Sequence, residues 1–231
     1  MTSPGLLLAR QLEVLFVRDA GARLVSTRDP APRPAPRVFL GRSADANVWA
    51  LHRDVAPRLA AELGRLLAAE PATAGDGCEP PHCRSRVCAL LGAVAHEHRG
   101  PAFILGDDPP RDDRAREIGV HDLPEVIPVF PWLAQELEAV APVVVAFAGG
   151  EPAAVCHAAR GMTSFAAEAG VETRERFRGR GLGTAAVSAW ARAVQRRGRV
   201  ALYSTAWENA ASRGIARRLG ARPYGENWHV T

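Results

Sequence analysis

The chain contains no lysine, and all 29 of its basic residues are arginine. A Walker-type phosphate loop ends in Gly-Lys-Ser/Thr, so this absence excludes the P-loop nucleotide-binding proteins. No apolar run approaches 18 residues, and the first residues lack the charged and apolar parts of a secretory signal. No serine or cysteine lies in a G-x-S-x-G nucleophile elbow, which disfavours a covalent acyl-enzyme. We therefore expect a cytoplasmic protein that does not span a membrane.

Cysteine is scarce as well, with four residues in 231. Three of them, Cys78, Cys83 and Cys88, are spaced five residues apart, with His82 between the first two. Structural zinc sites usually pair their ligands at C-x-x-C-like spacing, and this cluster departs from that pattern. We therefore expect free thiols in a reducing compartment and no metal, with zinc at this cluster as the alternative.

Negative charge is nearly absent from one part of the chain. Between Arg174 and Arg222, twelve arginines accompany only Glu175 and Glu208, which gives a local charge of +10. The whole chain carries +4, so the remainder carries −6. This polarisation favours a polyanionic ligand, although a solvated helix face is the alternative for the arginines at 192, 196, 197, 217 and 218. No helix-turn-helix signal or aromatic platform accompanies the charge, so we expect no nucleic-acid partner.

The N-terminal part reads as α+β material. With 47% hydrophobic residues, the chain can bury one core plus a smaller appended unit. Three strand-like runs and one helical pattern occupy the first 70 residues, at 11–17, 37–41, 47–52 and 54–69. Residues 71–86 are rich in proline, glycine and cysteine, as is typical of a linker. We place the domain boundary there, between an accessory region at 1–86 and a second domain at 87–231.

The most informative segment is 171–184, where a strand-like run leads through a basic, glycine-rich loop into a helix. The loop comprises Arg178, Gly179, Arg180, Gly181, Leu182, Gly183 and Thr184. Apolar residues recur at helical spacing over 182–197, which predicts a helix with one buried face. The unpaired amides at such a helix start attract anions, and glycines let a phosphate approach closely. Arginine side chains add forked donors, so the loop is a candidate pyrophosphate cradle.

The spacing of this loop identifies a family. A Rossmann site would need G-x-G-x-x-G and an acidic residue about 20 positions later. The R-x-x-G-x-G spacing after a strand instead resembles the GNAT N-acetyltransferase superfamily, which binds the pyrophosphate of acetyl-CoA there. A predicted strand at 199–206 and helix at 209–219 follow in the family's order. Apolar runs at 143–148 and 153–158, joined by a Gly-Gly-Glu-Pro turn, precede a third strand at 166–173.

The resemblance covers about residues 100–231, with its motif core at 142–225. It implies an α+β fold with a mixed, mostly antiparallel central sheet flanked by helices. It also implies that acetyl-CoA is the co-substrate, and that the backbone of Val171 to Thr173 faces the acetyl carbonyl and the pantetheine amides. Asn209 and Ser212 match the family's N-x-x-A/S segment beside the pantetheine arm. Asn209 equally suits the N-cap of the following helix.

Acetyl transfer to an amine needs a base, donors for the carbonyl oxygen and a proton for the departing thiolate. Glu168 and Glu172 are jointly the candidate bases. They lie four residues apart, and so on one face of their strand unless a bulge intervenes where the family's strand splays. Salt bridges to Arg174 or Arg176 are the alternative role of these glutamates.

The position of the acid departs from the family pattern. The family often has tyrosine seven residues after the asparagine, and this chain has Ala216 there. Ser212, Tyr203, Tyr224 or a water molecule are the alternatives. We predict direct transfer of acetyl from acetyl-CoA to a primary amine of an unknown acceptor. A non-catalytic acyl-CoA-binding regulator is the alternative that Ala216 motivates, and a homodimer is compatible with either.

Overall fold

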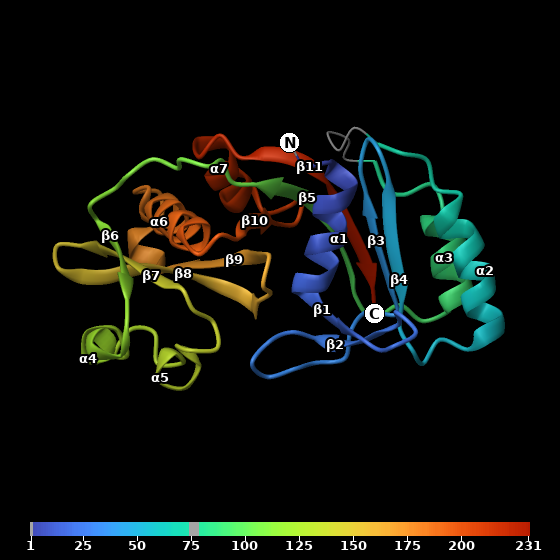
Figure 1. Ribbon diagram of the computed structural model, residues 1–231, viewed down its shortest axis with the longest axis horizontal. Helices are drawn as coiled ribbons and strands as arrows, with labels where there is room; N and C mark the ends of the chain where they lie inside the picture. Colours follow the sequence, from blue (N-terminus) through green and yellow to red (C-terminus); the bar gives the residue numbers. More distant parts are fainter. Residues whose placement is uncertain (1, 74–78) are drawn as a thin grey trace. The chain divides into compact units, whose positions relative to one another are not determined.

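The computed structural model describes residues 2–73 and 79–231, which form two compact units (Figure 1). The first unit comprises Met1–Phe103, Ser204–Ala210 and Pro223–Thr231, and the second comprises Ile104–Tyr203 and Ala211–Arg222. Two C-terminal segments therefore belong with the N-terminal residues. A boundary between an accessory region and an acyltransferase domain at residue 86 stays a prediction, because compactness does not define where the functional domain begins.

The first unit is built on a sheet with the strand order β4 (Asn47–Leu51), β3 (Val38–Arg42), β11 (Arg222–Val230) and β5 (Glu97–Ile104). Strand β3 pairs antiparallel with both β4 and β11. Because successive side chains point to opposite faces, β3 contributes to two cores. Val38 and Leu40 pack in a cluster with α2 (Pro57–Ala68) and α3 (Arg84–Leu91), whereas Phe39 packs with α1 (Pro4–Leu15). Figure 1 shows α1 on one side of β3 and β4 and the pair α2 and α3 on the other.

A small hairpin of β1 (Phe16–Arg18) and β2 (Leu24–Thr27) follows α1. The strand predicted at 11–17 is therefore wrong, because most of this run belongs to the helix. Ser3 caps α1 by accepting a hydrogen bond from the Leu6 amide at 3.3 Å, and Pro4 lies in the first turn of the helix. The β-branched and aromatic run around Phe16 suggested a longer strand, but burial of Leu8 and Leu12 at helical spacing decides for the helix.

The other predictions for the N-terminal residues agree better with the structure. The runs predicted at 37–41 and 47–52 are confirmed as β3 and β4, and the pattern at 54–69 is confirmed as α2. The predicted linker at 71–86 is partly wrong, because α3 begins inside it at Arg84. Helix α3 ends at Gly92, which has a φ of 73°.

The second unit has the strand order β10 (Val200–Ser204), β9 (Ala166–Thr173), β8 (Glu151–Met162), β7 (Val143–Ala148) and β6 (Ala115–Ile118). Its pairs are antiparallel, except that β10 runs parallel to β9. Gly149 and Gly150 both have positive φ and turn β7 into β8, which confirms the predicted hairpin. The predicted α+β class with a mixed, mostly antiparallel sheet is confirmed.

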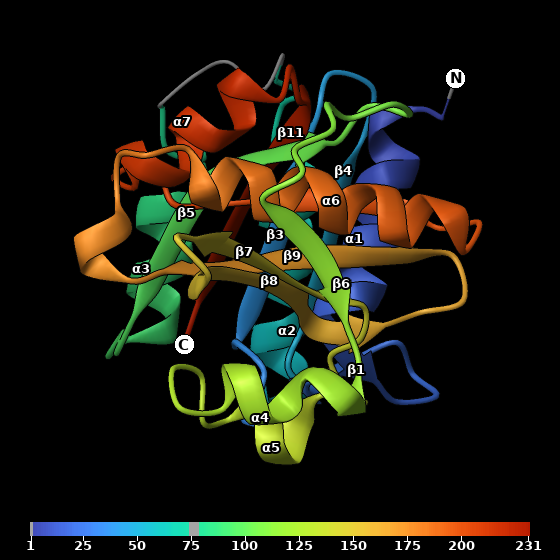
Figure 2. The same ribbon diagram turned by 90° about the vertical axis from the view of Figure 1, so that its left-hand side faces the viewer.

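Helices cover both faces of the strands of the second unit (Figure 2). Helix α6 (Leu182–Arg196) buries Ala186, Trp190 and Val194 and packs on β7, β8 and β9. The short helices α4 (Leu123–Val126) and α5 (Leu133–Glu136) cover the opposite face. Helix α7 (Ala210–Arg218) follows β10. No helix among the described residues has the length and apolar content to cross a bilayer.

Candidate functional site

The glycine-rich loop leads into α6 as the sequence predicts. A 3-10 turn at Glu175–Phe177 precedes it, and Gly179 and Gly181 have φ values of 77° and 80°. Gly181 is the N-cap of α6 and makes no side-chain capping hydrogen bond. The first amides of α6 therefore have no acceptor within the helix, and they carry the positive end of its dipole. This geometry suits a phosphate group.

Two further features of this helix start are typical of a binding site. A Cβ on Gly183 would lie 2.9 Å from the Thr173 hydroxyl oxygen and 3.3 Å from Cδ1 of Ile215. Only glycine therefore lets α6 approach the end of β9 so closely. The hydroxyl oxygen of Thr184 is buried without a hydrogen-bond partner among the described residues. A buried hydroxyl in that condition is costly unless a ligand or water satisfies it.

The arginines of the loop surround one aromatic ring. Guanidinium carbons of Arg174, Arg176 and Arg180 lie 5.3, 4.8 and 5.6 Å from the ring centre of Phe177, which is buried. Glu151 pairs with both Arg174 and Arg176, so the predicted alternative that these arginines neutralise the β9 glutamates is wrong. The ring thus holds three cations beside the helix start.

Two arginines remain available at the mouth of the loop. Arg178 and Arg180 are exposed and form no ion pair with any described residue. Arg178 donates through Nε to the Thr173 carbonyl at 3.3 Å, which leaves its two terminal nitrogens. Arg114 donates to the Arg180 carbonyl at 3.2 Å and fixes the loop backbone. Two forked cations next to unpaired amides can bind a diphosphate.

Strands β9 and β10 separate beside this loop. Their parallel pairing runs from Ala166 and Val200 only as far as Glu168 and Leu202, although β9 continues to Thr173. On its other side β9 stays paired with β8. The Arg174 amide bonds the Ala153 carbonyl on β8, so by alternation Val171 and Thr173 direct their backbone groups away from β8, to the unpaired edge. This edge has the donors and acceptors that a ligand with amide groups needs.

Glu168 and Glu172 lie on the same face of β9, as predicted, but in different environments. The bulge expected here lies in β8, which has three residues between Ala158 and Met162 where β9 has one between Ala167 and Ala169. Glu168 is only 5% exposed, whereas Glu172 is exposed and forms no ion pair with the described residues. A buried and an exposed carboxylate thus share one face.

The residues of the predicted N-x-x-A/S segment lie at the start of α7. Asn209 directly precedes the helix and is exposed, in the position of an N-cap. Ser212 and Ala216 lie one turn apart on α7, and Ala216 is buried. A tyrosine at 216 would therefore have no room to replace the alanine without repacking.

Tyr203 is the first β10 residue after the pairing with β9 ends. It is 1% exposed, and its hydroxyl oxygen has no hydrogen-bond partner among the described residues. The neighbouring Ser212 hydroxyl acts to lower the pKa of Tyr203, although the two hydroxyls do not meet the geometry of a hydrogen bond. Burial raises the pKa of Tyr203 to about 12. The phenol is protonated and available as a donor.

The sequence analysis missed His157. This residue lies on β8 opposite Gly170 of β9, and its ring centre is 4.8 Å from that of Trp132. Its Nδ1 lies 3.3 Å from the Ala158 carbonyl oxygen, and burial lowers the pKa of the imidazole from its ordinary value of 6.5. Only the register of β8 against β9 places His157 beside the glutamates, and the bulge at 158–162 hides that register from the sequence.

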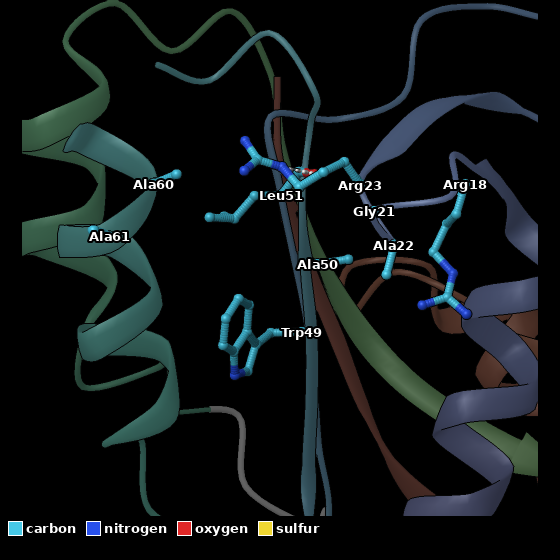
Figure 3. A pocket seen from close by; sticks show the side chains of 9 residues that line it. All are labelled: Arg18, Gly21, Ala22, Arg23, Trp49, Ala50, Leu51, Ala60 and Ala61. Atoms are coloured by element: carbon cyan, nitrogen blue, oxygen red, sulfur yellow. Dashed lines mark hydrogen bonds between the residues drawn. The ribbon is translucent and has the colours of Figure 1, made fainter. Parts of the chain in front are cut away.

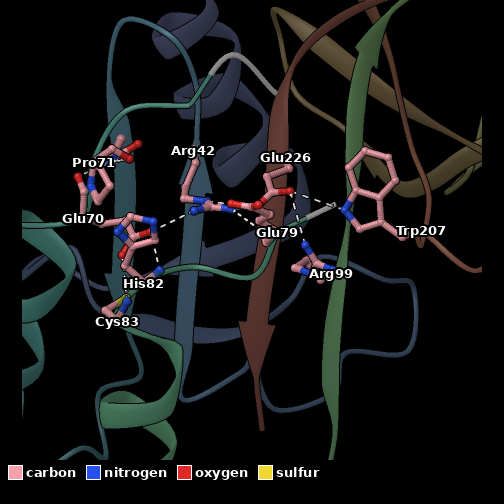
Figure 4. A network of polar contacts seen from close by, with 10 residues as sticks. Arg42, Glu70, Pro71, Glu79, His82, Cys83, Arg99, Trp207 and Glu226 are labelled. Carbon is pink, nitrogen blue, oxygen red and sulfur yellow. Dashed lines mark hydrogen bonds and ion pairs between the residues drawn. The ribbon is translucent and has the colours of Figure 1, made fainter. Parts of the chain in front are cut away.

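Cys83 is part of a buried polar network in the first unit (Figure 4). Arg42 donates to Glu226 at 2.9 Å, to Glu70 at 2.8 Å and to the Glu79 carbonyl at 2.7 Å. Glu70 in turn accepts from the Cys83 amide at 2.9 Å. Burial, with the neighbouring Glu70, raises the pKa of Cys83 to about 12, which makes its thiol a poor metal ligand and nucleophile.

Cys83 and Cys88 are free thiols, and Cys78 lies outside the described residues. Among the residues that the structure describes, no three His, Cys, Asp or Glu side chains are grouped so as to hold a metal ion.

A separate hollow of about 460 Å³ lies in the first unit beside Trp49 (Figure 3). Strand β4, the β1–β2 turn and α2 line it. Arg23 on its wall donates to the carbonyls of Leu51, His52 and Val55 and so ties the turn to β4. None of the predicted site residues borders this hollow.

Residues 157–230 match the family model of FR47-like proteins. A putative GNAT-family acetyltransferase from Novosphingobium aromaticivorans has a similar structure, with a TM-score of 0.50 and 23% identity over 60% of this chain and 65% of that chain. A Drosophila protein gives a TM-score of 0.50 and 16% identity over 80% of this chain and 73% of that one. At these identities the likeness establishes the fold alone. No curated protein matches the sequence.

Proposed function

We propose that the chain is a GNAT-type acyltransferase that transfers acetyl from acetyl-CoA directly to a primary amine. The observation that carries the proposal is the position of the α6 start beside the unpaired edge of β9. The first feature suits a diphosphate and the second suits the amide-bearing arm attached to it. Acetyl-CoA contains both groups in that order.

In this proposal the diphosphate occupies the loop. The amides of the first α6 turn and of Gly179 and Gly181 approach its oxygens, because the two glycines have no Cβ of their own. Arg178 and Arg180 supply charge-assisted hydrogen bonds. The Thr184 hydroxyl gains the partner that it otherwise lacks.

The pantetheine arm lies along the open edge of β9 in this proposal. The outward backbone groups of Val171 and the amide of Thr173, whose carbonyl accepts from Arg178, pair with the amides of the arm and donate to the acetyl carbonyl oxygen. A fixed amide stabilises the developing oxyanion without reorganising, which is the main electrostatic contribution in acyl transfer. Asn209 and Ser212, at the start of α7, are the further candidates for contact with the arm.

The amine enters on the face of β9 that carries Glu168 and Glu172. Its nitrogen forms a bond to the acetyl carbon, the carbon–sulfur bond breaks, and the proton of the resulting ammonium moves toward this acidic face. The two carboxylates together attract the cationic acceptor and favour removal of its proton. The acceptor is any accessible primary amine. We propose that the protein is located in the cytoplasm.

Tyr203 takes the place of the tyrosine that is absent at position 216. Its pKa of about 12 exceeds the value of about 8.5 for an ordinary thiol by roughly 3.5 units, so complete proton transfer to the thiolate is uphill by about 5 kcal/mol. A hydrogen bond from the phenol to the departing sulfur is the favourable alternative. The thiolate then takes its proton from water or from the acidic face.

Radiolabelled acetyl-CoA tests the proposal with a panel of a polyamine, an amino sugar, an aminoglycoside and a lysine-containing peptide. We expect label to appear on at least one amine, with one CoA released for each acetyl transferred. Thermal stabilisation by CoA with no transfer to any amine would favour the second function, a non-catalytic acyl-CoA-binding regulator, for which Ala216 is the specific observation. Absence of both stabilisation and transfer would contradict either function.

A further inference from the structure

We propose that His157 is the proton acceptor for the attacking amine. This inference rests on the proposed acyl transfer and assigns one of its steps to a single atom, Nε2 of the imidazole. Neither carboxylate on β9 then has to remove the proton itself.

The first support is the orientation of the ring. Nδ1 lies 3.3 Å from the Ala158 carbonyl oxygen, which only accepts hydrogen bonds, so Nδ1 carries the hydrogen of the neutral ring. Nε2 then carries the lone pair. The Trp132 ring, 4.8 Å away and inclined by 59°, restrains the imidazole in this orientation. A base that is oriented through one nitrogen and free at the other is the arrangement that proton abstraction requires.

The second support is the close approach at Gly170, the residue that faces His157 across the β8–β9 pair. A Cβ at position 170 would lie 3.0 Å from both Cε1 and Nε2 of His157. Glycine at this position therefore lets the imidazole lie against β9 with its Nε2 edge beside the strand. Gly170 directly precedes Val171, whose backbone faces the unpaired edge of β9, so the base lies within one residue of the proposed thioester site.

The third support is charge. Glu168 and Glu172 flank Gly170 on the same face of β9 and are diagonal neighbours of His157. Strand β7 places Val143 on this face, the segment before α5 contributes Trp132, and Arg160 follows on β8 itself. Carboxylates on the same face of the sheet favour the imidazolium that forms when Nε2 takes a proton. Burial keeps the pKa of the free imidazole below 6.5, so the ring is unprotonated at neutral pH.

For a neutral amine, the proposed step conserves bonds and protons. The amine nitrogen bonds to the carbonyl carbon, and the carbon–sulfur bond then breaks to give the amide and the CoA thiolate. One proton leaves the attacking nitrogen for Nε2 of His157. The imidazolium passes that proton through water to the thiolate, which restores the free base and yields CoA as the thiol.

The test compares wild type with His157→Gln and His157→Ala, using saturating acetyl-CoA and the panel amine that wild type acetylates fastest. We expect kcat/KM to fall about 10² to 10⁴-fold in both variants, while the Kd for CoA stays within twofold. The acid limb of the pH–rate profile should disappear. Free imidazole should restore part of the rate of His157→Ala, a result that a purely structural histidine would not give.

A second variant keeps the test valid if position 157 proves essential for folding. Gly170→Ala places a methyl group against Nε2 and should lower kcat at least tenfold with CoA affinity retained. Gly119→Ala is the control, because nothing lies within 4 Å of its added Cβ. Full activity with an unchanged acid limb in His157→Gln, or an unaffected Gly170→Ala, overturns the role of His157 and leaves acyl transfer intact. Lack of turnover by wild type removes both.

Discussion

Gly183 and Thr173 approach each other so closely that a Cβ on the glycine would lie 2.9 Å from the threonine hydroxyl oxygen. This contact joins the start of α6 to the end of β9, the two elements on which the proposed cofactor site depends. Gly183→Ala should push the helix start away from the strand and weaken CoA binding at least tenfold, or about 1.4 kcal/mol. Isothermal titration calorimetry with CoA measures this change.

Gly198→Ala is the matched control for that substitution. Gly198 lies just beyond the other end of α6 with a φ of 70° and no atom within 4 Å of an added Cβ. The change strains the backbone but leaves the cofactor loop alone, so CoA affinity should stay within twofold. Equal losses in the two variants would show a general effect on α6 and contradict the local role of Gly183.

Reversal of charge at Arg178 should weaken CoA binding more than tenfold, because Arg178→Glu removes a cation from the loop and places an anion near the diphosphate. The dependence of Kd on salt should flatten at the same time, since one charge contact is lost. Arg217→Glu makes the same charge change at an exposed position in the last turn of α7 and is the control. Unchanged affinity in Arg178→Glu and also in Gly181→Val would remove the phosphate-cradle assignment.

Tyr203→Phe separates a catalytic hydroxyl from a structural one. The hydroxyl has no hydrogen-bond partner among the described residues, so its removal should leave the free energy of unfolding unchanged or slightly raise it. If the phenol donates to the departing sulfur, kcat should fall about tenfold or more while the Kd for CoA stays the same. Urea unfolding and steady-state kinetics measure the two effects. A clear loss of stability with full activity would give Tyr203 a structural role only.

The glycine-rich loop could be predicted from sequence because its signals are local. A cluster of glycines, a helix with regular apolar spacing and a flanking strand all lie within residues 166–196, and the structure confirms the helix and the strand. The hairpin at Gly149 and Gly150 has an equally local cause. Such patterns depend on backbone preference and periodicity, which single-sequence reasoning captures.

The acceptor side could not be predicted because long-range pairing creates it. His157 faces Gly170 only because β8 carries extra residues after Ala158, and a strand register is invisible to composition. The burial of Arg42 depends on Glu226, which lies 184 positions away on β11. The strand predicted at 11–17 is wrong for a related reason, because the packing of α1 outweighs local β propensity.

The Arg42 network should dominate the stability of the first unit. Arg42 is 5% exposed between Glu70 and Glu226, which are 0% and 1% exposed. Arg42→Met leaves Glu70 buried without its cation and Glu226 with only Arg99, 4.0 Å away, and should cost about 3–5 kcal/mol in the free energy of unfolding. Arg86→Met breaks an exposed pair with Glu62 and should cause no measurable loss. Similar midpoints of urea unfolding for the two variants would contradict the importance of the network.

The same network should make the first unit sensitive to acid. Burial acts to raise the pKa of Glu70, but hydrogen bonds from the Cys83 and His82 amides and from Arg42 outweigh it and hold the pKa below 4.5. The unfolded chain then binds the proton more readily, so the contribution of Glu70 is present at neutral pH and is lost as pH falls below about 4.5. Glu70→Gln should therefore be less stable than wild type at pH 7, and the difference should shrink toward pH 3. Glu62→Gln, at an exposed pair, should follow the wild-type curve throughout. A gap between wild type and Glu70→Gln that stays constant from pH 7 to pH 3 would show that the charge of Glu70 does not contribute to the network.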